Sequence, residues 1–381
     1  MSMLKNLVVV LLAAVLAAAP VAAQTPTPAP APGSIEEARQ RAREEAQRAR
    51  EAAERAREAA RRVREQESEL RRSNRGGTRG PDRNDRGPEF TETFSRTVRI
   101  GRNGTFELGN VAGDITVTGG GGDDVRIDAV KRVRQQSEAD ARAIMREMEI
   151  RVTERSNQVE VRTEYPQRRR NWSGSVDYTI TLPASATVTL HSVSGDLRVT
   201  NVRGDLRADT VSGDVTASGI GRLRSVRTVS GDLMLTDVEG EDVSAGTVSG
   251  DATLRSLKVG GLTLEAVSGS LRFTDVEVAR ADFRTISGDI DFTGRLARNG
   301  RYRFQSQSGD IRLAPANDAG FDLEATSFSG AVRSDYTFRS GGTVESPERG
   351  PRTQSIRGTV GDASAVITLR SFSGNVTVLR R

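Results

Sequence analysis

The sequence predicts a mainly β protein, a parallel β-solenoid of 18–21 residues and two short strands per coil, preceded by a long charged α-helix. Three observations predict it. Ser-Gly pairs recur at nearly constant spacing, and apolar residues alternate at i and i+2 after each pair, which is the strand period. Upstream of the repeats lies a stretch rich in Ala, Arg and Glu, which are strong helix formers.

Composition limits the function before any motif is considered. The chain has 381 residues, enough for a substantial core, but only 4% are aromatic and 38 are glycine. A core of Val, Leu, Ile and Ala suits many short strands better than a deep enzyme pocket. Residues 24–87 hold 16 arginines and 12 acidic residues, against a net charge of +5 for the whole chain. The repeats are therefore nearly neutral, and nucleic-acid binding is not predicted.

Residues 1–23 are predicted to be a secretory signal cut after Ala23. Lys5 precedes an apolar run from Leu7 to Ala19, which is too short to span a bilayer easily. An uncleaved anchor is the alternative. The chain has no cysteine, so an exported fold would depend on burial and hydrogen bonds, without disulfides or a lipidated cysteine. The predicted location is the periplasm, the cell envelope or the exterior.

A linker, a helix and a second linker are expected next. Residues 24–33 form a Pro-rich spacer. Residues 34–72 form the charged helix, with Ser34 and Glu37 as a capping box. Small residues along it follow a heptad spacing that indicates a coiled coil: Ala42, Ala46, Ala49, Ala53, Ala56, Ala60 and Val63. A self-supporting stalk is favoured over self-association through this helix. Residues 73–87 form a flexible basic linker.

The body begins with a less regular part. Residues 88–190 are predicted to be an N-terminal cap that covers the open end of the stack. The cap would contain a first coil at 113–130, a short helix at 136–150 and two strands. The apolar face of this helix would be Ala141, Ile144, Met145 and Met148. Residues 191–381 hold the solenoid repeats, interrupted at 338–364 by a long polar loop.

Glycine marks each coil. Eight Ser-Gly pairs carry the predicted turn residues, at Gly195, Gly213, Gly231, Gly250, Gly269, Gly288, Gly309 and Gly330. A further copy carries Gly374, and an earlier relative carries Gly113. Stacking the coils in this order would place seven residues in one inward column: Leu197, Val215, Leu233, Ala252, Leu271, Ile290 and Ile311. The same alternation predicts that Leu206, Ala208 and Val211 also point inward.

The turn residues indicate architecture more than chemistry. Each glycine would supply a positive φ or room for the next coil. The serines would stack in a column, but the chain has one histidine, His191, so a Ser-His enzyme is not predicted. The triplet Arg203-Gly204-Asp205 resembles an integrin-binding sequence, and we interpret it as another turn of the repeat.

The repeated aspartates leave alternatives open. Asp196, Asp214, Asp232 and Asp251 would stand about 4.8 Å apart, where two charges in water repel by about 0.9 kcal/mol. Local backbone N–H groups in Asx-turns are the favoured compensation. A calcium ion held by these four residues is the second interpretation, and catalytic carboxylates are the third. No cofactor is predicted.

The runs "TVSGDVTAS", "TVSGDLMLT", "TVSGDATLR" and "AVSGSLRFT", preceded by "VDYTITLPASATVTLHSVSGDL", resemble the bacterial putative-adhesin family of repeat-strand domains. The resemblance covers roughly residues 100–381. It implies an exported or envelope β-solenoid whose function is unassigned. Ser270 and Ala331 depart from the repeat, which has Asp at these positions.

The function expected from these observations is a non-enzymatic binding or scaffold module of the envelope or surface. Its ligand, a protein or a glycan, would contact the flat faces of the solenoid. A self-assembling structural protein is the first alternative, and a glycan-active enzyme is the second.

Overall fold

The computed structural model describes residues 87–166, 172–339, 341–345 and 354–380. They belong to one compact unit, Arg83–Arg381. The signal at 1–23, the linker at 24–33, the helix at 34–72 and nearly all of the linker at 73–87 lie outside the described residues. Within the part that is described, no helix is long and apolar enough to cross a membrane.

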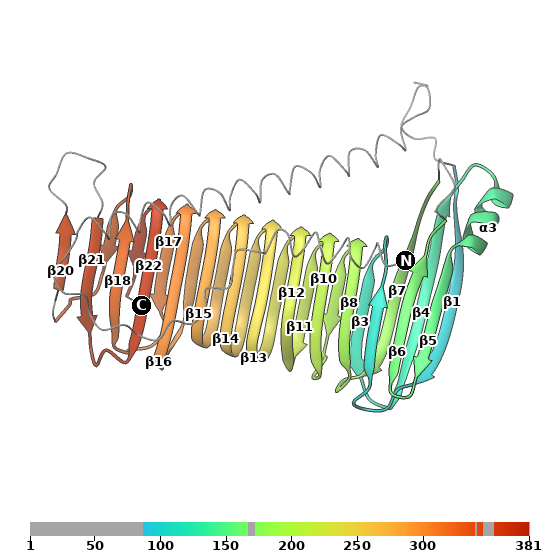
Figure 1. Ribbon diagram of the computed structural model, residues 1–381, viewed down its shortest axis with the longest axis horizontal. Coiled ribbons are helices and arrows are strands. Elements are labelled where there is room, and N and C mark those ends of the chain that lie inside the picture. The colour runs from blue at the N-terminus through green and yellow to red at the C-terminus, as the bar shows by residue number, and fades with distance from the viewer. Residues whose placement is uncertain (1–86, 167–171, 340, 346–353, 381) are drawn as a thin grey trace, which may run out of the picture. The chain divides into compact units, whose positions relative to one another are not determined.

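The described strands form two walls that face each other across one core (Figure 1). Strands that lead into a Ser-Gly corner make wall 1, and strands that leave it make wall 2. Four strands, β13 to β16, bend at the second corner and contribute to both walls: β13 (Leu233–Ser249), β14 (Ala252–Ser268), β15 (Leu271–Ser287) and β16 (Ile290–Ser308).

The order of strands in each wall follows from their pairing. Wall 1 runs β5 (Glu149–Arg155), β6 (Gln158–Glu164), β2 (Thr105–Gly109), β8 (Thr187–Ser194), β10 (Asp205–Ser212), β12 (Arg222–Ser230), the second halves of β13 to β16, β22 (Ala365–Ser373), β18 (Phe321–Ser327), β21 (Gln354–Val360) and β20 (Gly341–Glu345). Wall 2 runs β1 (Glu89–Arg99), β4 (Asp124–Arg134), β7 (Ser173–Pro183), β3 (Ile115–Gly120), β9 (Leu197–Thr200), β11 (Val215–Ile220), the first halves of β13 to β16, β17 (Ile311–Pro315), β23 (Val376–Val378) and β19 (Val332–Ser334).

The predicted inward column is confirmed. Parallel pairing aligns Leu197 with Val215, Val215 with Leu233, and so on through Ala252, Leu271, Ile290 and Ile311. All seven side chains are buried. The prediction of two short strands per coil was wrong for the middle of the stack, where each coil is one strand of 17–19 residues that bends at the second corner. The register between β15 and β16 shifts at this bend.

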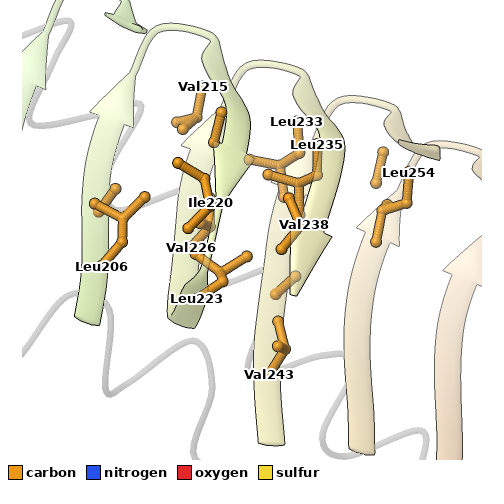
Figure 2. Close-up of a cluster of buried hydrophobic side chains, with 14 of the residues drawn as sticks. Leu206, Val215, Ile220, Leu223, Val226, Leu233, Leu235, Val238, Val243 and Leu254 are labelled. Carbon is orange, nitrogen blue, oxygen red and sulfur yellow. The ribbon is translucent and has the colours of Figure 1, made fainter. Parts of the chain in front are cut away.

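The core fills the space between the walls. Figure 2 shows aliphatic side chains from consecutive coils, such as Leu206, Val226 and Leu235, pointing into this space. Further along the stack the filling becomes aromatic. Phe273 of wall 2 stacks on Phe283 of wall 1 with ring centroids 4.0 Å apart, and Phe283 stacks on Phe304 at 4.7 Å. The Phe273–Phe283 contact crosses the core and joins the two walls, whereas Phe283 and Phe304 stack along wall 1.

Antiparallel strands close the first end of the stack. β4 pairs antiparallel with β1 and β7, and β5 pairs antiparallel with β6. The first coil predicted at 113–130 is therefore only partly correct, because β3 stacks as a coil strand whereas β4 runs against its neighbours. Helix α3 (Glu138–Glu147) packs on β4 and β1 through Ala141, Ile144 and Met145, and Met148 beside it is also buried.

The far end does not follow chain order. β22 lies between β16 and β18, and β23 lies between β17 and β19, so the last repeat in the sequence is inserted before the one that precedes it. The expected stacking of Gly330 directly on Gly309 was wrong for this reason. The expected loop at 338–364 contains β20 and β21, which extend wall 1 in antiparallel fashion.

The second corner of each coil uses left-handed backbone. Asn201, Asp237, Ser256 and Asp275 have φ between 51° and 57°, and Gly219 has φ 65° at the equivalent position. Asn, Asp and Gly adopt this conformation at low cost. The extra residue lets the chain reverse while the following side chain, for example Val202 or Ile220, still points inward.

Candidate functional site

The Ser-Gly-Asp corners form a continuous edge along the stack. The corner serines pair in register, for example Ser212 with Ser230 and Ser230 with Ser249. Most of the corner glycines have a left-handed φ, which is 148° at Gly213. A Cβ added to Gly213 would lie 2.1 Å from the carbonyl oxygen of Gly195. The close approach of coils therefore requires glycine here, and positive φ adds to that requirement.

Five corner glycine carbonyls also accept a hydrogen bond from a buried hydroxyl of the neighbouring coil. The Thr228 hydroxyl donates to Gly213 O at 3.2 Å, and the Thr247 hydroxyl donates to Gly231 O at 3.3 Å. Ser306, Ser371 and Ser327 do the same at later corners. Sequence reasoning missed these inward hydroxyls. The signal was a Thr or Ser two residues before most of the corner serines, with Ala266 as an exception, at the inward phase of the strand period.

The aspartates form a ladder between coils. Asp196 Oδ1 accepts from the Asp214 amide at 3.0 Å, Asp214 Oδ1 accepts from the Asp232 amide at 2.8 Å, and Asp232 Oδ1 accepts from the Asp251 amide at 2.8 Å. In each of these bonds, a side-chain oxygen of one coil serves as the acceptor for the backbone amide of the next. The expected Asx-turns within a coil are replaced by bonds to the following coil.

The two departures from the repeat have different consequences. Ser270 donates its amide to Asp251 Oδ1 at 2.8 Å, but it offers no carboxylate to the Asp289 amide above it. The ladder resumes with Asp289, which accepts from the Asp310 amide at 2.8 Å. Ala331 occupies the last rung, where it donates to Asn375 Oδ1 at 3.0 Å. In the described part of the chain no strand pairs with the free edge of β19, so no amide of a further coil needs an acceptor at Ala331.

The calcium interpretation has little geometric support. One oxygen of each carboxylate in the column Asp196, Asp214, Asp232 and Asp251 is engaged by an amide. Among the described residues, no three Asp, Glu, His or Cys side chains are grouped closely enough to hold a metal ion.

Val211 does not point inward as expected. Thr210 is fully buried at the inward position, and Val211 lies half-buried on the outer side of wall 1. The residues that precede the corner serines thus form an outer apolar column: Val193, Val211, Val229, Val248, Val267, Ile286, Phe372 and Phe328, with Gln307 as the polar member. Phe328 and Phe372 stack with centroids 4.8 Å apart and are 36% and 46% exposed.

His191, the one histidine of the chain, lies beside the carboxylate of Asp209. Its Nδ1 is 3.6 Å from Asp209 Oδ2 across neighbouring coils of wall 1. Burial raises the pKa of the Asp209 carboxyl, and the charges of His191 and Arg227 oppose that rise. The pair lines neither of the two hollows described next.

A hollow of about 460 Å³ lies on the outer face of wall 1, over the second halves of β13 to β16 and β22. Two neighbouring rows of outward side chains border it. One row aligns Asp242, Gly261, Arg280, Arg301 and Val366, and the other aligns Thr263, Asp282, Arg303 and Thr368. The hollow exists at Gly261 because that position has no side chain, and Asp242 reaches across it to Arg280 at 2.7 Å.

A second, more open hollow of about 860 Å³ follows the second corner. Its outward row alternates in charge, with Glu239, Lys258, Glu277 and Arg295 aligned in consecutive coils. Mixed charge without a shared centre gives it no preference for one class of ligand.

Two of the solved structures that match this chain are similar to it at low sequence identity. A putative cell adhesion protein from Clostridium sporogenes is 12% identical, with a TM-score of 0.22, over 77% of this chain and all of that one. A putative lipid binding protein from Parabacteroides distasonis is 10% identical, with a TM-score of 0.34, over 75% of this chain and 96% of that one. No curated protein matches this chain.

The match to a family model agrees with the region that carries the coils. The model described as Toastrack DUF4097 covers residues 106–379, from the first strand of wall 1 in chain order to the end of the last coil. The chain belongs to the Toastrack DUF4097 family, a family of unknown function.

Proposed function

We propose that this protein is an exported, non-enzymatic binding module of the cell envelope, and that it recognises its ligand on the outer face of wall 1. The observation that carries the proposal is the exact register of the stack. On wall 1, Asp242 and Ser244 of β13 are aligned in register with residues of β14, and these in turn with Arg280 and Asp282 of β15. A wall of this kind presents rows of groups at a fixed spacing of about 4.8 Å, which suits recognition without rearrangement.

The chemistry of the wall-1 hollow supports binding over catalysis. Its two carboxylates are engaged by arginines, Asp242 by Arg280 at 2.7 Å and Asp282 by Arg284 at 3.0 Å. The hollow therefore supplies contacts and charge, and it lacks the unpaired acid that bond cleavage in a glycan requires.

The export component rests on the predicted signal at 1–23. Cell fractionation combined with surface protease accessibility tests it, because a protein that stays in the cytoplasm would contradict export. Accessibility to added protease would distinguish display on the surface from a periplasmic location.

Binding is tested with the purified full-length protein and isolated bacterial envelopes. Thr263→Trp fills the wall-1 hollow, and Thr253→Trp adds the same ring to the outer face of wall 2. We expect Thr263→Trp to reduce retention on the envelopes and Thr253→Trp to leave it unchanged. Equal retention of both variants would exclude wall 1 as the binding face. Absence of retention for the unmodified protein, with large particles in light scattering, would favour self-assembly instead.

A further inference from the structure

The outer face of wall 1 carries an uneven distribution of arginine charge. Arg280 pairs with Asp242, and Arg284 pairs with Asp282 at 3.0 Å and Glu265 at 3.7 Å. These pairs use the acidic groups of β13 to β15 that face this side. Within the described residues, Arg301 and Arg303 of β16 have no ion pair. Two guanidinium groups therefore stand uncompensated at one border of the hollow.

The backbone that carries these two arginines is firmly held. Tyr302 lies between them in sequence and points into the core, 2% exposed. Its hydroxyl donates to Val278 O at 2.6 Å and accepts from the Ala297 amide at 2.7 Å. Phe304, which directly follows Arg303 in the sequence, stacks on Phe283. A fixed strand holds the backbone of both arginines in place before a ligand arrives, so only their side chains lose freedom on binding.

We propose that the wall-1 hollow binds a phosphate ester, with Arg301 and Arg303 as its cationic ligands. A tetrahedral oxyanion offers three or more oxygens and can accept from two guanidinium forks at once, whereas a single carboxylate is satisfied by one. The inference rests on the proposed binding function and names the chemistry of its ligand.

The remaining border of the hollow restricts the ligand further. Val366 is aligned with Arg301 and is 51% exposed, so it offers an apolar contact next to the charged one. Asp242 and Asp282 face the same hollow and would repel a second phosphate. The site thus favours one phosphate joined to an uncharged alcohol portion, and it disfavours a polyanion such as nucleic acid.

The test uses the full-length protein, glycerol phosphate as a soluble probe, and phosphatidylcholine vesicles with and without phosphatidic acid. Arg301→Gln/Arg303→Gln removes the two free charges. Arg255→Gln/Arg272→Gln is the matched control, because it removes two outward arginines without an ion pair, within the described residues, from wall 2. We expect the first variant to bind at least about tenfold more weakly, as expected for lost charge-assisted hydrogen bonds, and the control to bind as the unmodified protein does.

Each outcome decides the proposal. Binding of glycerol phosphate shows that a free phosphate ester is sufficient, and binding only to phosphatidic acid vesicles assigns the site to a lipid headgroup. An equal loss in both double variants would show non-specific charge attraction and overturn the proposal, as would no binding of any probe. In that last case, envelope retention that still depends on Thr263 would keep the wall-1 binding function while removing the phosphate.

Discussion

Replacing Gly213 with alanine tests whether the contact between coils determines the corner residue. The added Cβ would lie 2.1 Å from Gly195 O, and real Cβ contacts are essentially never shorter than 3.0 Å. The neighbouring coil would have to move by about 1 Å in a closely packed stack. Alanine would also take the φ of 148° observed at Gly213, at a cost of about 1–3 kcal/mol.

The movement weakens hydrogen bonds as well as packing. The Gly213 amide donates to Ser230 O at 3.0 Å, and the Asp214 amide donates to Asp196 Oδ1 at 3.0 Å. Each bond contributes about 0.5–1.5 kcal/mol. Together with the cost of the φ angle, we expect Gly213→Ala to lower the free energy of unfolding by about 2–6 kcal/mol.

Urea denaturation followed by far-UV circular dichroism measures this loss. Gly109→Ala in β2 is the matched control, because nothing lies within 4 Å of its added Cβ. The control should change the free energy of unfolding by less than about 0.5 kcal/mol. If both variants unfold at the same urea concentration, close approach of the coils does not explain the repeated glycine.

Three further predictions follow from the corner and wall 1. Ser270→Asn supplies the missing acceptor without adding charge and should raise the free energy of unfolding by about 0.5–1.5 kcal/mol in urea melts, whereas Ala331→Asn should be neutral. Asp214→Ala should lower the free energy of unfolding by about 1 kcal/mol, and Asp214→Asn should leave it unchanged. The melting temperature of the unmodified protein should not rise in millimolar calcium, and a rise that a chelator reverses would restore the calcium interpretation. Asp209→Asn should stabilise the protein near pH 7, because the raised pKa of the Asp209 carboxyl means that folding disfavours its charged form. The gain should vanish in acid, where this carboxyl is protonated in both the folded and the unfolded protein. Thermal melts at several pH values measure the gain, and a gain that persists in acid would contradict this reasoning.

The repeat was predictable because its signals are local. A spacing of i and i+2 determines which side chains share one face of a strand, and a constant period determines which residues of neighbouring coils align. Leu197 could therefore be assigned to the same column as Val215 without a structure. The direction of Val211 was not predictable from apolarity alone. Thr228 can hold the inward position because Gly213 O of the previous coil accepts from its hydroxyl, whereas the buried Thr210 hydroxyl has no hydrogen-bond partner within the described residues.

Long-range order was harder to predict than local structure. Gly330 and Gly374 share the motif Ser-Phe-Ser-Gly, so nothing local shows that the later copy stacks first on Gly309. The order depends on which coil the returning chain pairs with, and β22 fits both β16 and β18 in parallel register. The wall-1 hollow was missed for a similar reason, since it arises from one glycine whose neighbours are a whole coil away in sequence.

The corner aspartates and the arginines of the wall-1 hollow differ in whether their charged groups are free to bind a ligand. The corner aspartates are numerous, but each has an oxygen bonded to an amide of the next coil, as Asp214 does to Asp232 at 2.8 Å. A cation would have to compete with those bonds and would then weaken the contact between coils. Arg301 and Arg303, by contrast, carry positive charge without an ion pair within the described residues, on a strand that Tyr302 anchors in the core. A ligand can bind there without disturbing any bond that holds the coils together, so an anion is the partner that this architecture can accept at least cost.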